Sequence, residues 1–304
     1  MNFIRRASGL GILIFVTTAL AGCNLRILDP AGPVAAGQRT ILLNALATML
    51  CIVVPTMLAT LAFSWWFRPG NTAAKRLPTW SFSGQIEIVT WSVPLMTIVF
   101  LGGIAWIGAH DLDPAKPLRS EKKPLEVQVI SLDWKWLFIY PEQKIASLNY
   151  LVLPVGTPVR LHLTSSSVWD TFFVPQLGSM IYTMNGMATQ LNLQANREGS
   201  FYSLSTHLSG DGFSDMNFET RVVPPEAFAN WFSGAQASIS TLDDDAYKAL
   251  SRQSIKDPPV TYRLADDGLF DRIVGQSLPP GPGPEKGKPN PSVKPTTTIS
   301  KQGT

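Results

Sequence analysis

Two long apolar runs dominate the first third of the sequence. Residues 41–67 carry no charged side chain, and residues 86–109 carry only one, Glu87. A helix needs about 20 apolar residues to cross a bilayer, and both runs exceed that length. We therefore predict two transmembrane helices, 41–67 and 86–109. Pro55 and Pro94 lie inside them, where a membrane helix tolerates proline.

The pattern changes after residue 124 from long runs to short alternating segments separated by Gly, Pro and Asn. Short strands at such spacing are typical of a β-sandwich or barrel. A linker, residues 110–124, precedes them. The predicted strands are 125–130, 133–140, 159–164, 172–175, 189–195, 200–204 and 216–222.

A third pattern begins at Pro224. Helical stretches at 226–232, 243–252 and 269–273 define a helical C-terminal arm, residues 224–278. Residues 279–304 consist mainly of Pro, Gly, Lys and Thr. Because such a composition buries too little apolar surface to order a chain, we predict a disordered tail there.

The first residues have the pattern of a secretory signal: a basic start, an apolar stretch over 7–20, and small residues before Cys23. The ending Leu20-Ala21-Gly22-Cys23 resembles a bacterial lipobox. That resemblance implies a lipoprotein signal peptide, residues 1–22, cleavage before Cys23, and lipid on the Cys23 sulfur and amino group. Residues 23–40 would then be a periplasmic segment. The alternative is an uncleaved helix with an incidental cysteine.

The loop between the two apolar runs indicates their orientation. Residues 68–85 contain Arg68, Lys75 and Arg76 and no acidic residue. Short loops rich in Lys and Arg stay in the cytoplasm, so the chain beyond residue 110 is expected on the outer side. Glu87 then lies near the cytoplasmic end of the second helix. An ionisable residue there suggests a function, although a carboxylate reaching the interface is an equal alternative.

Composition excludes two classes of function. The formal net charge of +3 and the absence of a basic run argue against nucleic-acid binding. With only Cys23 and Cys51, a disulfide framework is not expected.

No cysteine follows Cys51, so a copper site that needs a thiolate has no ligand in the β-domain. His162, alone on a predicted strand, is expected to be a packed or partly exposed residue.

The combination of lipobox, helical hairpin and external sandwich resembles subunit II of the haem–copper respiratory oxidases, over about residues 20–275. Three motifs carry the resemblance. Residues 85–94, QIEIVTWSVP, resemble the start of that family's second helix. Residues 133–136, DWKW, resemble its aromatic segment near the catalytic subunit, and residues 173–178, FVPQLG, its loop after the first copper histidine. The implied fold class is membrane α + β: a two-helix transmembrane hairpin, a periplasmic cupredoxin-like β-sandwich (125–223) and the short helical arm.

The copper loop departs from the cytochrome c oxidase branch of that family. In that branch, cysteine thiolates and histidine imidazoles bind the copper. In this chain most of those positions hold side chains that lack a sulfur or imidazole ligand, whereas the methionine, Met216, is retained. The replaced positions are Asp170 and Phe213 for the histidines, Ser205 and Ser209 for the cysteines, and His207 for the glutamate. This loss resembles the quinol oxidases, in particular the bo-type ubiquinol oxidases, and implies that the chain binds no metal.

The resemblance implies a complex that oxidises ubiquinol, reduces dioxygen to water and pumps protons. The haems and copper would belong to subunit I, and this chain would carry no cofactor. Its partners would be subunit I, further small membrane subunits and lipid of a bacterial inner membrane, but not cytochrome c. Glu87 matches a glutamate at the mouth of the K pathway for protons. Trp134 and Trp136 would lie at a subunit interface or in the core.

Two alternatives remain open. A cytochrome c oxidase subunit would need the copper relay that the missing cysteines remove. A membrane lipoprotein scaffold or assembly module with a degenerate cupredoxin domain would not need the two-span hairpin that carries Glu87.

Overall fold

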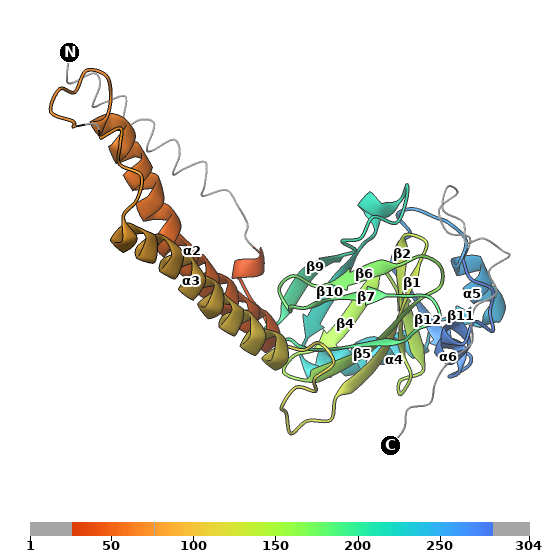
Figure 1. Cartoon of the computed structure of the whole chain (residues 1–304). Coiled ribbons are helices and arrows are strands. Elements are labelled where there is room, and N and C mark those ends of the chain that lie inside the picture. Colours follow the sequence, from red (N-terminus) through yellow and green to blue (C-terminus); the bar gives the residue numbers. More distant parts are fainter. Residues whose placement is uncertain (1–25, 76, 282–304) are drawn as a thin grey trace, which may run out of the picture.

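The computed structural model describes residues 26–75 and 77–281. The predicted signal peptide 1–22, Cys23 and the tail from residue 282 onward lie outside this range. In the described part, a long helical hairpin projects from a β-sandwich that carries additional elements on its far side (Figure 1).

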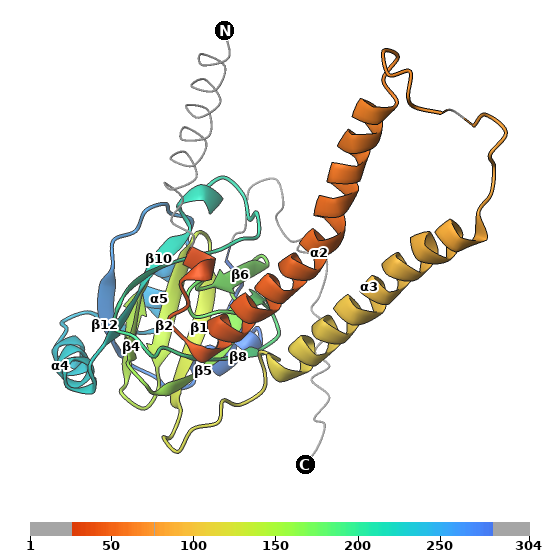
Figure 2. The same ribbon diagram turned by 90° about the vertical axis from the view of Figure 1, so that its left-hand side faces the viewer.

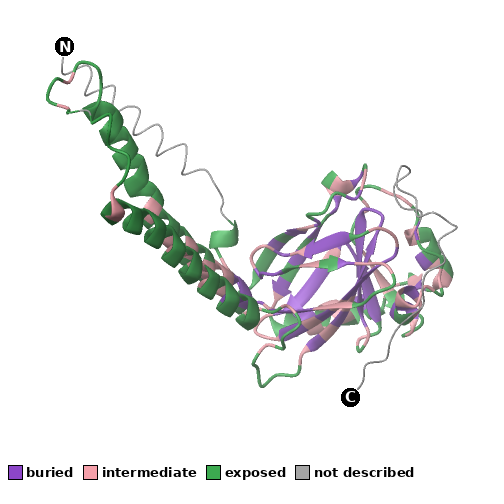
Figure 3. Cartoon of the chain, viewed as in Figure 1, coloured by how far each residue is buried: buried purple, intermediate pink, exposed green. Residues whose placement is uncertain are grey.

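The hairpin consists of α2 (Pro33–Trp66) and α3 (Gly84–Asp111), both long and apolar enough to cross a membrane. Their side chains are exposed along most of the length, unlike the buried sandwich (Figure 3). The two helices meet beside the sandwich and diverge toward the loop that connects them (Figure 2). A helix that is apolar on all sides and exposed in the isolated chain fits lipid or a membrane partner.

The first helix begins at Pro33, eight residues before the predicted start at 41. Proline suits the first helical position because its missing N–H would have no partner there. The added turns contact the sandwich rather than lipid. The Ala35 amide donates to the Leu177 carbonyl at 3.2 Å, and the Ala31 amide to that of Gln176 at 2.7 Å. The predicted periplasmic segment 23–40 is therefore partly helical, and it fixes the domain to the hairpin.

Two sheets form the sandwich in the described residues. The larger sheet has the order β11 (Thr241–Leu242), β12 (Val260–Leu264), β3 (Ile145–Leu148), β2 (Lys135–Tyr140), β1 (Leu125–Leu132), β5 (Pro158–Ser165) and β8 (Thr189–Gln194). The smaller sheet has the order β4 (Tyr150–Pro154), β10 (Asn217–Val223), β9 (Gly199–Leu204), β6 (Asp170–Phe173) and β7 (Met180–Thr183).

The main core lies between these sheets. Odd-numbered positions of β1 and even-numbered positions of β2 point into it, as the two-residue period of a strand requires. Trp136 is fully buried there, with ring centroids 5.6 Å from Phe172 and 5.5 Å from Phe218. On the opposite face, Ile130 and Leu132 of β1 and Leu137 and Ile139 of β2 form a second core with the arm.

Most of the C-terminal arm covers the outer face of the larger sheet, whereas its first helix packs against the main core through Phe228 and Ala235. The arm contains α4 (Pro225–Gln236), α5 (Asp244–Leu250) and α6 (Leu269–Val274), in agreement with the helical prediction. It also contains β11 and β12, which the prediction missed. β12 pairs with β3 in antiparallel register and so extends the sheet into the arm. Because the arm packs on one face and the main core on the other, β2 and β3 are buried on both faces, which explains the unbroken apolar run 136–140 in β2.

An ion pair between a buried lysine and a half-buried aspartate connects this arm to the sandwich. The ammonium of Lys135, 2% exposed, lies 3.2 Å from the Asp257 carboxylate and donates to the Arg252 carbonyl at 2.8 Å. The Asn149 side chain donates to the Asp257 carbonyl at 2.9 Å. A cation in the interior is tolerated only with such partners, so Lys135 determines where the 252–257 segment lies.

Candidate functional site

The positions that correspond to copper ligands lie close together at one end of the smaller sheet. Ser205 and Ser209 belong to the loop between β9 and β10, and Asp170 begins β6. The Ser205 amide donates to the Met216 carbonyl at 3.1 Å, which closes the loop. The Ser209 hydroxyl lies 3.9 Å from the Met216 sulfur. All four side chains are buried, so the structure brings these predicted positions together.

The other two positions lie apart from this buried group. His207 is exposed, and its ring packs edge-on against Tyr182 at a centroid distance of 5.8 Å. Phe213 is half-buried at the start of η2 (Phe213–Asp215). His162 is also half-exposed and pairs with Glu126 at 3.0 Å, as expected for a surface strand residue.

Asp170 is the chemically unusual member of the group. Burial raises the pKa of its carboxyl group to about 7, although nearby hydroxyls of Ser209, Ser131 and Ser205 act in the opposite direction. The neighbouring Asp133 carboxylate adds to the rise in this pKa. One oxygen, Oδ1, is buried and has no hydrogen-bond partner among residues 26–75 and 77–281. Desolvation therefore dominates, and the neutral carboxylic acid is favoured up to near-neutral pH.

This donor set does not fit a thiolate-bridged copper centre. It offers two hydroxyls, one carboxyl group and one thioether, whereas such a centre needs soft thiolates and imidazoles. In the part of the chain that the structure describes, no group of three or more His, Cys, Asp or Glu side chains could hold a metal ion. The loop is held instead by hydrogen bonds among hydroxyl groups, such as that between Thr171 and Thr206 at 2.6 Å.

Trp134 connects the β1–β2 turn to this loop. Its backbone is in the left-handed region, with φ of 64°, which is strained for a bulky side chain. The indole Nε1 donates to the Ser209 carbonyl at 3.1 Å, and the ring packs on Gly212. Trp134 is 9% exposed and Trp136 is fully buried. Trp136 therefore belongs to the core, and Trp134 keeps only a small accessible surface.

Glu87 lies at the opposite end of the molecule, in the first turn of α3. Its side chain is exposed and makes no ion pair or hydrogen bond within residues 26–75 and 77–281. A carboxylate in the first turn complements the positive end of the helix dipole. Of the two cysteines, Cys51 is exposed on α2, whereas Cys23 falls outside the described range.

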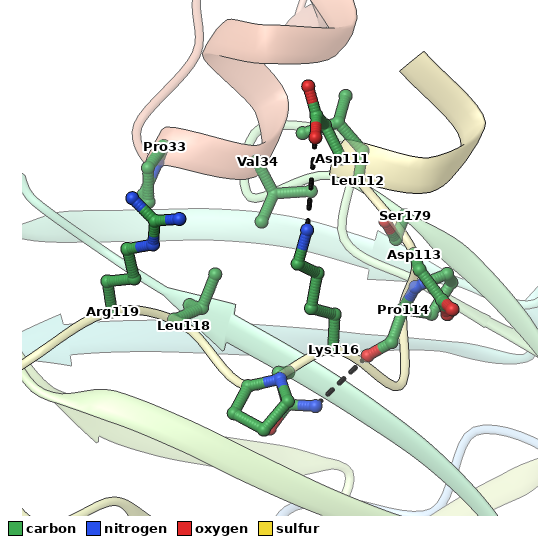
Figure 4. Close-up of a pocket in the computed structure, with 12 residues that line it drawn as sticks. Pro33, Val34, Asp111, Leu112, Asp113, Pro114, Lys116, Leu118, Arg119 and Ser179 are labelled. Carbon is green, nitrogen blue, oxygen red and sulfur yellow. Dashed lines mark hydrogen bonds and ion pairs between the residues drawn. The ribbon is translucent and has the colours of Figure 1, made fainter. Parts of the chain in front are cut away.

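The junction between hairpin and sandwich contains a pocket of 410 Å³ beside the linker. Lys116 points across it toward Asp111, with Nζ 3.8 Å from the carboxylate oxygen (Figure 4). The Asn192 side chain donates to the Pro114 carbonyl at 3.1 Å. These contacts join the predicted linker 110–124, of which residues 110 and 111 belong to α3, to β8.

Comparison with known proteins supplies the family. Residues 125–223 match the family described as "Cytochrome C oxidase subunit II, periplasmic domain", and residues 236–281 match "COX Aromatic Rich Motif". The chain is 46% identical over 259 residues to "Ubiquinol oxidase subunit 2" of Acetobacter aceti, a match that covers 84% of each chain. The chain belongs to the ubiquinol oxidase subunit 2 family.

Two further relatives in this family are named "Cytochrome bo(3) ubiquinol oxidase subunit 2". The protein of Pseudomonas aeruginosa is 44% identical over 255 residues, which are 84% of this chain and 77% of the relative. That of Buchnera aphidicola subsp. Baizongia pistaciae is 44% identical over 282 residues, which are 91% of this chain and 99% of the relative. The resemblance inferred from the sequence motifs is therefore confirmed.

As a ubiquinol oxidase subunit 2, the chain is part of a multi-subunit respiratory oxidoreductase of the inner membrane. Its two apolar helices and its periplasmic domain agree with the predicted fold class. Sequence reasoning did not predict the ion pair of Lys135 with the arm or the burial of the Asp170 carboxyl group. A signal was present for Lys135, because a single cation inside a run of buried aromatic residues requires a partner.

Proposed function

We propose that this chain is a non-catalytic subunit of a proton-pumping ubiquinol oxidase and that it carries no CuA relay. The observation that supports this proposal is the structure of the loop that corresponds in position to the copper-binding loop of the cytochrome c oxidase branch. Ser205, Ser209 and Asp170 are buried together and present oxygen atoms where a copper relay needs thiolates and imidazoles. Electrons from ubiquinol would pass directly to haems and copper in subunit I, where dioxygen is reduced to water.

The role of this subunit is then to cap the outer face of subunit I with its sandwich and to pack beside it with its hairpin. Further small membrane subunits and lipid would complete the surroundings. Of the two tryptophans, only Trp134, which is 9% exposed, has surface available for a subunit contact. The chain itself would bind neither cytochrome c nor any cofactor.

The experiment that tests this proposal is purification of the complex through this chain, followed by a reduced-minus-oxidised visible spectrum and oxygen uptake. Haem bands, together with uptake driven by ubiquinol but not by reduced cytochrome c, are the expected result. Uptake driven by cytochrome c would contradict the proposal. A preparation without haem would favour the alternative, a membrane lipoprotein scaffold or assembly module with a degenerate cupredoxin domain.

Glu87 is proposed to lie at the entrance of a proton pathway that continues in subunit I. Its support is the exposed carboxylate in the first turn of α3, on the end of the hairpin remote from the sandwich. There a carboxylate can collect protons from the cytoplasm and pass them to a partner. We expect Glu87→Gln to slow ubiquinol-driven oxygen uptake while the complex assembles normally.

The matched control for this variant is Glu121→Gln, an exposed carboxylate in the linker on the outer side. It removes the same charge without touching the cytoplasmic end, so turnover should stay at the wild-type rate. Unchanged oxygen uptake in an assembled Glu87→Gln complex would remove Glu87 from the proton pathway.

Cys23 is proposed to be the lipidated amino-terminal residue of the mature chain, after removal of residues 1–22. The motif Leu20-Ala21-Gly22-Cys23 and the apolar stretch before it support this assignment. Lipid at Cys23 would place the start of the mature chain at the periplasmic surface of the inner membrane. The mass of the amino-terminal peptide tests this assignment directly.

A further inference from the structure

An apolar groove of 590 Å³ lies where the start of the described chain meets the sandwich. One wall is the short helix η1 (Arg26–Leu28), the second is the outer end of α2, and the third is formed by strands β6 and β9 of the smaller sheet. Phe173, Leu204 and Tyr202 form the sheet side of the groove, whereas Leu43 and Leu46 form the helix side.

The side chains in this groove are unusually exposed for their type. Ile27 is 52% exposed, Leu42 47%, Leu46 50% and Tyr202 41%. A contiguous set of large apolar side chains that remains open to solvent marks a surface that something else covers. Although Arg26 and Thr206 belong to the lining, the groove exposes almost only apolar surface, so it favours an apolar occupant over a polar peptide or a free anion.

The position of the groove relative to the membrane restricts the occupant further. Leu42, Leu43 and Leu46 belong to the outer end of the predicted span 41–67, whereas Phe173 and Tyr202 belong to the periplasmic sandwich. The groove therefore connects the edge of the hydrocarbon layer with the base of the domain. A hydrocarbon chain that enters from the bilayer can follow this path.

The chain brings its own lipid attachment point to this place. Cys23 precedes Arg26 by three residues, and an extended segment of that length spans at most about 10 Å. The Arg26 guanidinium lies over the Tyr202 ring, 4.6 Å from its centroid, and this contact fixes η1 on the groove wall. The tether is thus short and its anchored end already lies at the groove.

We infer that an acyl chain carried by Cys23 occupies the groove between η1, α2 and the smaller sheet. This assignment rests on the proposed lipidation of Cys23 and adds a binding site on the protein for the lipid. The acyl chain would fill the space between the hairpin and the sandwich. The lipid would then help to hold the domain against the hairpin, in addition to anchoring the chain in the bilayer.

A photoactivatable fatty acid tests the inference in the intact complex. Cells that express the full chain are fed a diazirine fatty acid, membranes are irradiated, and the purified complex is digested and analysed by mass spectrometry. The expected product joins the Cys23 peptide, through its acyl chain, to peptides that contain residues 42–46, 173–175 or 202–206. Such a product distinguishes the covalent lipid from a free phospholipid, which would add only its own mass to those peptides.

A matched pair of variants tests whether the groove itself is responsible. Tyr202→Glu places a carboxylate in the wall, where burial beside an acyl chain would strip its water, so the cross-link yield should fall at least about tenfold. The new carboxylate can pair with Arg26, so η1 is expected to stay in place. Tyr182→Glu changes a tyrosine of similar exposure, 43% against 41%, outside the groove, and the yield should not change.

Two outcomes would overturn the inference, and they are distinguishable. If Cys23 is acylated but cross-links only elsewhere, or if the groove carries only phospholipid adducts, the groove assignment is wrong and lipidation stands. If the amino-terminal peptide carries no acyl chain, both the lipidation and the groove assignment are wrong. In that case ubiquinol-driven oxygen uptake by the same preparation still reports separately on the proposed oxidase function.

Discussion

The buried carboxyl group of Asp170 should make the stability of the sandwich dependent on pH, and its replacement by the isosteric amide should remove that dependence. The carboxyl group is 1% exposed, its Oδ1 has no hydrogen-bond partner in the described part of the chain, and its pKa is raised to about 7. Asp170→Asn keeps the size of the side chain and abolishes its ionisation.

The magnitude follows from the two pKa values. In the unfolded chain the carboxyl group has its ordinary pKa of 3.8, so it ionises at a lower pH than in the folded domain. Below that pH both states are protonated and the group has no effect. As the pH rises toward 7, only the unfolded state gains by ionising, and the free energy of unfolding falls. The full loss, reached above pH 7, corresponds to about 4 kcal/mol.

The variant recovers only part of this free energy, because an amide must also be desolvated when it is buried. We expect Asp170→Asn to be more stable by about 1–3 kcal/mol near pH 8. For a folded unit of this size that gain raises the melting temperature by roughly 3–10 °C. The advantage should shrink steadily between about pH 8 and pH 5, because the wild-type penalty shrinks over the same interval.

The assay is thermal unfolding of the purified full-length chain in its complex, followed by tryptophan fluorescence at several pH values. Trp136 packs edge-on against Phe172, which lies on the same strand as Asp170, so its emission reports on this region. Asp211→Asn, an exposed aspartate in the neighbouring loop, is the control and should follow the wild-type profile. A melting-temperature difference between Asp170→Asn and wild type that stays constant across the pH range would refute the reasoning.

Two further predictions concern packing. Lys135→Met removes the cation that holds Asp257 and should destabilise the sandwich by about 2–4 kcal/mol, with earlier protease cleavage in the arm; an unchanged cleavage rate would contradict this role. Gly212→Ala would place a Cβ 2.3 Å from the Trp134 ring and should cost about 1–3 kcal/mol. Gly234→Ala, where nothing lies within 4 Å of an added Cβ inside α4, is its control and should stabilise by about 0.5–1 kcal/mol. Chemical denaturation measures both, and equal midpoints would contradict the clash at Gly212.

The membrane hairpin could be predicted from the sequence because a bilayer imposes a simple requirement. A spanning helix must be apolar around its whole circumference and about 20 residues long, and the two runs satisfy this without reference to the rest of the chain. The start of α2 could not be predicted in the same way. Residues 33–40 are helical because Ala35 and its neighbours pack on the 176–178 loop, which lies far away in the sequence.

The sandwich shows the same division. In strands with one face in the core, such as β5 and β8, apolar and polar residues alternate along the sequence, and these strands were predicted. The structure adds β3, β4 and β7, which were missed. β3 and β4 are separated only by Asn149, whose φ is 53°, yet they belong to different sheets, so the sequence shows one unbroken segment where the structure has two strands. The strands of the arm were missed because their pairings, of β12 with β3 and of β11 with β12, join segments that lie far apart in the sequence.

The sequence by itself determined the fold class, the family resemblance and the replacement of the copper ligands, because each depends on residue type and local spacing alone. Only the tertiary structure decided that Asp170, Ser205 and Ser209 are buried together, that Trp136 belongs to the core, and that η1 and α2 enclose an apolar groove with the sandwich. Burial, pKa and the shape of a groove depend on which distant segments meet. Loop closure and sheet pairing determine these long-range contacts, which cannot be read from a local sequence pattern.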